Sequence, residues 1–263
     1  FHPMRSRIDV SGDGLLAFVT KSGEQDVLHL YDVVTESMVS TFRHAQIVSI
    51  GSVSWGPDGR QIAFAAIDRA GQNDLYILNT DTQELRRLTN DSYDDRDPAW
   101  SPHGDCIAFT SDRTSFGTEG IYNLFRYDIA THDIEYLTYG EESVSAPAWS
   151  RDGAKLAFTC NADGMNNIWV MDLRSPHPQG VRTMTRVSAF LTSAFDPAWT
   201  SSGDLVFTAF EKFSFNLQVM PHVQAVLDTA TTIKAMDVAH HGSPWEPRSL
   251  SGDNEREHSK YKG

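Results

Sequence analysis

The stretch DSYDDRDPAW, residues 91–100, holds the densest group of side chains that could do chemistry. Its aspartates lie directly ahead of a Pro-Ala-Trp sequence, and further acidic residues precede two later copies of that sequence. The full group consists of Asp94, Asp95, Asp97, Glu142 and Asp196. Carboxylates that cluster either repel one another, which raises a pKa, or attract a cation or a basic peptide.

Two interpretations of these carboxylates are open. If the Pro-Ala-Trp segments line a common channel, the acidic residues converge at one mouth of it and favour a cationic peptide or a cation there. Alternatively, Asp97 and Asp196 accept hydrogen bonds from nearby backbone N–H groups, as aspartate often does in turns. Arg96 lies among the carboxylates and could act as their internal counter-ion.

Motifs for catalysis and cofactor binding are missing from the sequence. It has no Gly-x-Ser-x-Gly nucleophile elbow, no His-Glu-x-x-His zinc motif and no Gly-rich phosphate loop. The loop 161–167, NADGMNN, resembles the start of a calcium loop but lacks the late glutamate. We therefore expect no cofactor, and Ca²⁺ bound at this loop is the alternative. Two cysteines, Cys106 and Cys160, cannot build a disulfide framework or a zinc site.

The elements that position the acidic residues are repeated along the chain. PAWSPHGDCIAF begins at Pro98 and PAWSRDGAKLAF at Pro147, and three weaker copies begin near residues 8, 53 and 196. Successive turn glycines from Gly14 onward are 45, 45, 49 and 50 residues apart. The positions shared by the four clearest copies are Trp55, Trp100, Trp149, Trp199, Gly59, Gly104, Gly153 and Gly203. Such a period indicates a solenoid, a propeller or an array.

Each repeat predicts four short antiparallel strands. The Pro-Ala-Trp stub leads into a tight turn that ends in glycine, and strands such as CIAFTS, NLFRYDI and IEYLTY follow. Four strands in 45–50 residues without helical periodicity predict a blade of an all-β propeller. Phe109 and Phe158 should then be buried between adjacent blades, and the four tryptophans should be related by rotation about one axis.

The predicted propeller covers residues 1–239, and a polar extension covers 240–263. Five blades are recognisable, near residues 8–44, 53–91, 98–140, 147–187 and 196–239. A sixth, degenerate or strand-exchanged blade is the alternative, because TTIKAMDVA (231–239) could supply an outer strand and sequence outside the chain could complete the ring.

These repeats resemble those of TolB-type propellers, in which a PxWSPDG start precedes an Ile-Ala-Phe strand and an Ile-Tyr-Val-Met-Asp strand. The resemblance covers about residues 8–220. It implies a periplasmic or secreted protein of the bacterial cell envelope, or a module of a larger envelope protein, which binds a protein or a peptide without catalysis. The same blades also occur beside hydrolase domains of the prolyl-oligopeptidase and tricorn types. A propeller that gates or recruits substrate for a hydrolase outside this chain is therefore the alternative.

The net charge and the hydropathy of the sequence limit the classes of partner that the chain could bind. The net charge of −13 argues against nucleic acid, whose binding depends on Lys and Arg at phosphates. No apolar run reaches the roughly 18 residues that a membrane-spanning helix needs. We therefore expect a protein or peptide partner, which could be cationic, and neither nucleic acid nor a membrane span.

Overall fold

The computed structural model describes residues 7–174, 181–230 and 232–237, and in these residues the chain forms an all-β propeller of five antiparallel sheets. The first blade contains β1 (Asp9–Val10), β2 (Leu15–Ser22), β3 (Gln25–Asp32) and β4 (Ser37–Phe42). The second contains β5 (Ile47–Trp55), β6 (Gln61–Asp68), β7 (Asn73–Asn79) and β8 (Leu85–Arg87). The third contains β9 (Asp95–Trp100), β10 (Cys106–Ser111), β11 (Asn123–Asp128) and β12 (Ile134–Tyr136).

The last two blades share the remaining strands unequally. The fourth blade contains β13 (Val144–Trp149), β14 (Lys155–Cys160), β15 (Asn167–Asp172) and β16 (Val181–Arg186), and the fifth contains β17 (Ser193–Trp199), β18 (Leu205–Glu211) and β19 (Ser214–Met220). A 3₁₀ turn, η1, covers Gly117–Glu119, and the short helix α1 covers Val223–Leu227. After α1, β20 (Thr232–Asp237) pairs with β16 rather than with β19. The described part of the segment 231–239, Thr232–Asp237, thus supplies an outer strand, but to the fourth blade and not to the fifth.

Each blade packs on the next through one repeated pattern of large and small side chains. The second strand carries a branched residue and a phenylalanine on its leading face, which we define as the face toward the preceding blade. Leu156 and Phe158, on β14, are fully buried there together with Leu124 of the third blade. The intervening Ala157 lies on the trailing face, toward the following blade, and joins a core cluster with Phe207. The alanine has no bulk beyond Cβ, so the next sheet can approach closely.

The expected burial of the repeat phenylalanines is confirmed. Phe109 is fully buried in a cluster that includes Leu75 of the second blade, and Phe158 is buried against the third blade. Because each blade buries both faces only between neighbours, the core consists of a series of inter-blade clusters rather than one central cluster.

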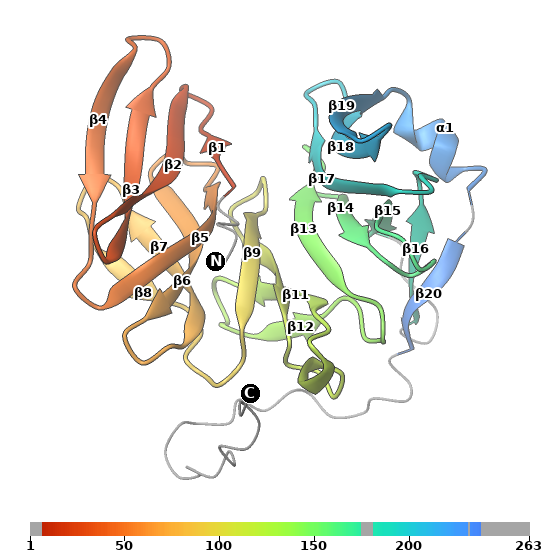
Figure 1. Cartoon of the computed structure of the whole chain (residues 1–263), viewed down its shortest axis with the longest axis horizontal. Helices are drawn as coiled ribbons and strands as arrows, with labels where there is room; N and C mark the ends of the chain where they lie inside the picture. The colour runs from red at the N-terminus through yellow and green to blue at the C-terminus, as the bar shows by residue number, and fades with distance from the viewer. Residues whose placement is uncertain (1–6, 175–180, 231, 238–263) are drawn as a thin grey trace.

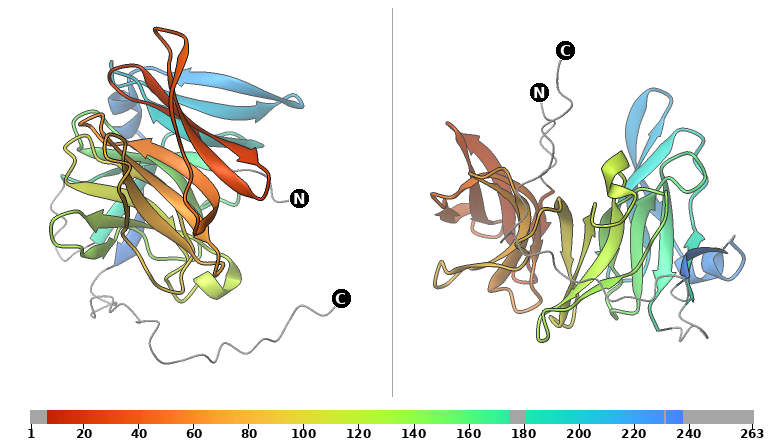
Figure 2. Two further views of the ribbon diagram at one scale, coloured as in Figure 1. Left: turned by 90° about the vertical axis from the view of Figure 1, so that its left-hand side faces the viewer. Right: turned by 90° about the horizontal axis from the view of Figure 1, so that it is seen from below.

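The blades stand in sequence around an axis that runs toward the viewer in Figure 1, with the first and fifth blades on either side of an opening at the top. In the left view of Figure 2 the first blade, in red, stands in front of the blue β18–β19 hairpin, so these two blades face each other across that opening. No strand pairing joins the two among the described residues. The chain therefore forms a five-bladed arc whose two end blades each have one neighbour.

Candidate functional site at the propeller axis

The carboxyl ends of the inner strands meet at one end of the axis and bring the repeat tryptophans together. Trp55, Trp100, Trp149 and Trp199 pair in register with the branched residue of the neighbouring strand, namely Ile62, Ile107, Leu156 and Leu205. The four tryptophans thus occupy one repeat position, as the sequence predicts. Together with the prolines and alanines beside them they line a cavity of about 270 Å³.

Two of the four indole rings are fixed by hydrogen bonds to the neighbouring blade. Trp149 Nε1 donates to the backbone oxygen of Ala99 at 2.9 Å, and Trp199 Nε1 donates to that of Ala148 at 3.1 Å. Trp55 and Trp100 are buried, whereas Trp149 and Trp199 are half-buried. The aromatic surface that a ligand could reach is therefore concentrated on the fourth and fifth blades.

The turns that follow the tryptophans form the rim of this cavity, and the turn glycines are held in the left-handed region. Gly59, Gly104, Gly153 and Gly203 have φ values of 65°, 75°, 66° and 83°. A Cβ on Gly104 would lie 3.2 Å from Pro57, and one on Gly153 would lie 2.8 Å from His103. The turns of successive blades are thus packed against one another.

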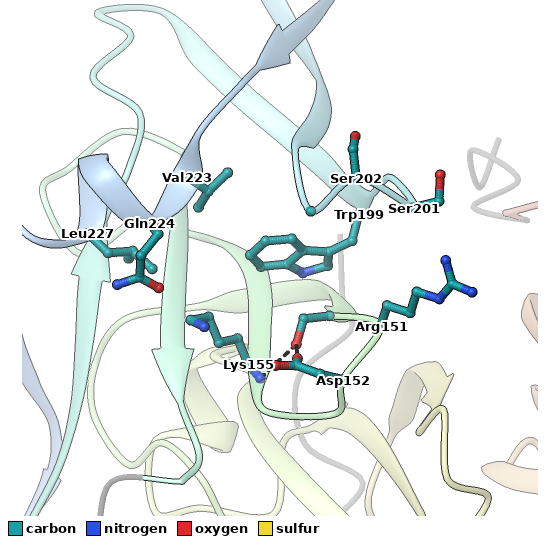
Figure 3. A pocket seen from close by; sticks show the side chains of 11 residues that line it. Arg151, Asp152, Lys155, Trp199, Ser201, Ser202, Val223, Gln224 and Leu227 are labelled. Atoms are coloured by element: carbon teal, nitrogen blue, oxygen red, sulfur yellow. Dashed lines mark hydrogen bonds between the residues drawn. The ribbon is translucent and has the colours of Figure 1, made fainter.

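A second cavity of about 240 Å³ lies between the turns of the fourth and fifth blades, where this packing is interrupted (Figure 3). Arg151 stands at the repeat position of Pro57 and Pro102, and no atom lies within 4 Å of where a Cβ on Gly203 would be. The cavity shares Ser150, Arg151 and Trp199 with the axial cavity, so the two are adjacent.

The second cavity combines an aromatic floor with positive charge. Figure 3 shows the Trp199 indole at its centre, with Arg151 and Lys155 on different sides and Val223 and Leu227 on the α1 side. Asp152 accepts a hydrogen bond from Ser150 Oγ at 2.6 Å, which lowers the pKa of its carboxyl. Arg151 and Lys155 form no ion pair within the described residues. The cavity therefore presents two cations and one ionised carboxylate beside the Trp199 indole.

Asp97 lies in the amino-terminal half of its inner strand, β9, and its hydrogen bonds join three blades. Its carboxylate accepts hydrogen bonds from Ser52 Oγ of the second blade at 2.8 Å and from the backbone N of Ala146 of the fourth at 3.1 Å. Asp97, Ala146 and Asp196 all have positive φ, between 50° and 55°, at a shift in strand register just before the repeat proline. This bulge turns the side chain of Asp97 across the axis.

Asp95 and Asp94, in contrast, are held by neighbouring cations. The buried Asp95 carboxylate takes two hydrogen bonds from Arg113 Nη2, at 2.5 and 2.7 Å, so it is not presented at the channel mouth. Asp94 pairs with Arg96 and accepts hydrogen bonds from Asn73 Nδ2 and from the Tyr122 hydroxyl. The counter-ion role suggested for Arg96 is thus fulfilled toward Asp94.

Three buried carboxylates in this region lie close enough to hold a cation. The oxygen atoms of Asp74, Asp91 and Asp95 approach within 4.8 Å of one another. Guanidinium groups already neutralise them, because Arg113 pairs with Asp91 and Asp95 while Arg87 pairs with Asp74. We therefore interpret the cluster as an ion-pair network that fixes the loop ahead of β9.

Glu142 and Asp196 are the predicted acidic residues that remain nearest to solvent. Asp196 is exposed, and its backbone N donates to Thr159 Oγ1 at 3.2 Å. Glu142 is half-buried, and its backbone oxygen accepts a hydrogen bond from Asn123 Nδ2 at 3.1 Å. With the half-buried Asp97, these two are the carboxylates of the group that a ligand could reach at this end.

A buried polar residue at the start of the third strand connects each inner blade to the next one, and sequence reasoning missed it. Asn167 Oδ1 accepts hydrogen bonds from the Phe190 backbone N and from Ser188 Oγ, both at 2.9 Å. Asn123 binds the Gly140 backbone N at 2.9 Å in the same way. Asp74 is at the equivalent position: it pairs with Arg87 of its own blade and accepts a hydrogen bond from the Asp91 backbone N, ahead of the third blade, at 3.5 Å. The signal was available, because a polar residue precedes the apolar run in NDLYIL, YNLFRY and NNIWVM.

The remaining sequence candidates are the loop 161–167 and the two cysteines. In the loop that resembles a calcium loop, Asp163 pairs with Arg186. Cys106 and Cys160 are buried free thiols, and burial raises the pKa of each to about 12. Neither cysteine is therefore a thiolate at neutral pH.

The comparison with known families decides the classification. The sequence profile of the TolB beta propeller domain matches residues 9–140. The chain belongs to the TolB β-propeller family. The inner strands of the first three blades, β1, β5 and β9, lie within this match.

Individual TolB proteins share this repeat at moderate identity. The Tol-Pal system protein TolB of Francisella tularensis subsp. holarctica is 30% identical over 154 residues, which are 59% of this chain and 33% of that protein. A putative TolB from Agrobacterium tumefaciens has a similar structure, with a TM-score of 0.67 at 18% identity over 88% of this chain and 79% of that one. An uncharacterised peptidase of Bacillus subtilis is 41% identical over 56 residues, 21% of this chain and 8% of that protein.

The residues that align with this chain make up a minor part of each of these two relatives. The chain spans about a third of the length of the Francisella TolB and less than a tenth of the Bacillus peptidase. Within the described residues, no helix has both the length and the apolar character needed to cross a membrane.

Proposed function

We propose that this propeller is a non-catalytic module of the bacterial cell envelope that binds a protein or peptide segment at the axis. The observation that carries the proposal is the cavity of about 270 Å³ in which half-buried tryptophans of two blades face the axis. Aromatic side chains that are rigidly held contribute strongly to binding because little side-chain entropy is lost on contact. Trp149 and Trp199 are held in this way by their bonds to Ala99 and Ala148.

The adjacent position of the two cavities favours an extended segment over a compact small molecule. A side chain in the axial cavity would contact the tryptophans and prolines, while the continuation of the segment follows the shared wall of Ser150, Arg151 and Trp199. The Tol-Pal assignment of the Francisella relative supports a protein partner and an envelope location.

The opposite end of the axis provides a second contact in this proposal. Asp97, Glu142 and Asp196 would favour a basic segment there, since the remaining two carboxylates of the acidic group are paired internally. Attraction of this kind weakens with added salt, because the Debye length falls from about 10 Å at 0.1 M to about 3 Å at 1 M. Added salt should therefore weaken the contact of a basic segment with these carboxylates.

Selection of peptides tests the proposal directly. A phage-displayed library of random peptides is selected on the immobilised 263-residue chain, and the affinity of the enriched peptides is measured by calorimetry. We expect Trp199→Ala to abolish their binding, while Leu191→Ala, at a leucine that is exposed in a distant loop, leaves it unchanged. Enrichment that is indifferent to Trp199 would reject the axial site, and loss of binding in Glu142→Gln with Asp196→Asn would place the contact at the acidic end.

A second candidate function rests on the Bacillus relative, which is named as a peptidase and matches 56 residues of this chain. In that case the propeller gates or recruits substrate for a hydrolase domain outside residues 1–263. The discriminating measurement is peptide hydrolysis by the parent polypeptide with and without Trp199→Ala. A change in substrate selectivity in the variant favours this role over the envelope role.

A further inference from the structure

The second cavity exists because the turn of the fifth blade departs from the repeat. This turn, from Trp199 to Leu205, is one residue shorter than the turn of the fourth blade, from Trp149 to Leu156. The turns of the second and third blades have the length of the fourth. The shorter turn does not reach the turn before it, so the space beside Gly203 stays open.

Both cations that line the cavity also depart from the repeat. Arg151 stands at a position that is proline in the second and third blades, and Lys155 stands where those blades have the uncharged Gln61 and Cys106. The same turn forms with the uncharged residues, so the blade fold does not require either cation. Both charges and the shortened turn nevertheless coincide at one cavity.

The single carboxylate among the lining residues already has partners in its own turn. Asp152 accepts hydrogen bonds from Ser150 Oγ at 2.6 Å and from the Ala154 backbone N at 3.2 Å. It also pairs at 3.5 Å with Arg174, which does not line the cavity. Two lining cations therefore stand against one carboxylate that is neutralised from outside. The cavity is a locally positive site on a chain with a net charge of −13.

The apolar part of the cavity lies between the two cations. Figure 3 shows the Trp199 indole with Arg151 on one side and Lys155 on the side nearer α1. Val223 and Leu227 of α1 close the cavity beyond the indole. Its volume of about 240 Å³ is below the range of about 300–1,000 Å³ for sites that enclose a drug-sized ligand. The space therefore suits one large side chain.

We propose that the second cavity binds an acidic peptide segment, in which one large apolar side chain contacts the Trp199 indole and the acidic residues on either side of it pair with Arg151 and Lys155. The proposal rests on the proposed function for the peptide nature of the ligand and adds the chemistry of the segment. Pairs of carboxylates with guanidinium and ammonium groups are the charge-assisted hydrogen bonds that select such a segment.

NMR titration of the 263-residue chain with two peptides tests the proposal. Both peptides are acetylated and amidated, so that only their side chains carry charge, and their sequences are Gly-Glu-Phe-Glu-Gly and Gly-Gln-Phe-Gln-Gly. The indole N–H signals are followed, and Trp199→Phe assigns the signal of Trp199. We expect the Glu peptide to shift this signal and the Gln peptide to bind about tenfold more weakly, because two ion pairs are lost.

Substitutions taken from the other blades test the two cations without disturbing the turn. Arg151→Pro with Lys155→Gln introduces the residues that the second blade has at these positions. We expect this double variant to bind the two peptides equally. Arg60→Gln removes an exposed cation from the turn of the second blade and serves as the control, which should keep the preference for the Glu peptide.

Three results would overturn the proposal: equal binding of the two peptides by the wild-type chain, an undiminished preference in the double variant, or a Glu peptide that leaves the Trp199 signal unchanged. Lys155 lines the second cavity but not the axial cavity, so Lys155→Gln separates this proposal from the proposed function. If library-selected peptides depend on Trp199 while Lys155→Gln leaves the preference for the Glu peptide intact, the acidic segment is rejected and the axial binding site stands.

Discussion

The Arg113 guanidinium lies against both oxygens of the Asp95 carboxylate, at 2.5 and 2.7 Å, and neither side chain is exposed to solvent. The same guanidinium pairs with Asp91 at 3.2 Å and lies 5.3 Å from the centroid of the Phe109 ring. It therefore neutralises two buried carboxylates and packs on the core phenylalanine of the third blade. Burial nevertheless raises the pKa of Asp95, because desolvation outweighs the attraction of Arg113.

Arg113→Met should destabilise the propeller by about 3–5 kcal/mol at neutral pH, the usual cost of leaving one partner of a buried ion pair uncompensated. The variant keeps an apolar stem against Phe109 but leaves Asp91 and Asp95 without their cation. The loss of unfolding free energy in the variant should become smaller as the pH falls, because protonation of the two carboxylates removes the uncompensated charge. Urea unfolding at neutral and acidic pH measures both effects.

The double variant Asp95→Leu with Arg113→Met serves as the control for this prediction. It removes one of the stranded charges, so it should be more stable than Arg113→Met alone. A double variant that is no more stable than the single one would show that Arg113 acts through packing rather than through its charge.

Asp74 should make the stability of the propeller depend on pH. Burial raises the pKa of its carboxyl from an ordinary value of 3.8 to about 6, despite the neighbouring Arg87. The folded state therefore binds the proton more tightly than the unfolded state. The stability that this group contributes is fully present below its ordinary pKa and is lost as the pH rises through about 6. The loss is at most about 3 kcal/mol, since one pKa unit corresponds to about 1.4 kcal/mol.

Asp74→Asn isolates this contribution, because the amide keeps the shape of the carboxyl and does not titrate. Between pH 4 and pH 7, the difference in unfolding free energy between wild type and variant should change in favour of the variant. A constant difference across this range would mean that Asp74 has the same pKa in the folded and unfolded states.

The repeat elements were predictable from the sequence because each depends on local chemistry. The turn glycines need positive φ, the tryptophans precede the turn at a fixed distance, and Phe109 and Phe158 alternate with a small residue. Five copies of such a pattern indicate one environment repeated five times. The blade architecture follows from that repetition alone.

Contacts made outside the repeat could not be predicted in this way. Arg113 belongs to the loop between β10 and β11, and nothing in its sequence neighbourhood indicates that it pairs with Asp95. The acidic group of residues 91–97 looked uniform in sequence, yet the fold buries Asp95 and leaves Asp97 half-buried. Likewise, the pairing of β20 with β16 depends on which sheet edge lies within reach of the chain after α1.

Phe158→Ala should cost about 3–5 kcal/mol, the range for a large aromatic side chain removed from a packed core. Phe158 is fully buried between the third and fourth blades. Phe18 occupies the same repeat position on the half-buried leading face of the first blade, so Phe18→Ala is the matched control and should cost clearly less. Chemical denaturation of both variants provides the comparison, and equal losses would mean that the leading face of the first blade is covered in solution.

The last prediction concerns Asp97 and Asp196, which share a repeat position and a left-handed backbone but not their contacts. The Asp97 carboxylate accepts hydrogen bonds from Ser52 Oγ and from the Ala146 backbone N, whereas the Asp196 side chain is exposed. Asn tolerates the positive φ at both positions, so Asp→Asn changes charge and acceptor capacity without backbone strain. Asp97→Asn should destabilise the propeller by about 1–3 kcal/mol, because one bridging acceptor is lost at a partly buried site.

Asp196→Asn should leave the melting temperature nearly unchanged. If its carboxylate contacts a basic ligand, Asp196→Asn should weaken binding in low salt and make no difference at 1 M salt, where screening is strong. Differential scanning calorimetry and binding measurements on the same two variants separate the roles, and a large loss of stability in Asp196→Asn would assign this residue a structural role as well.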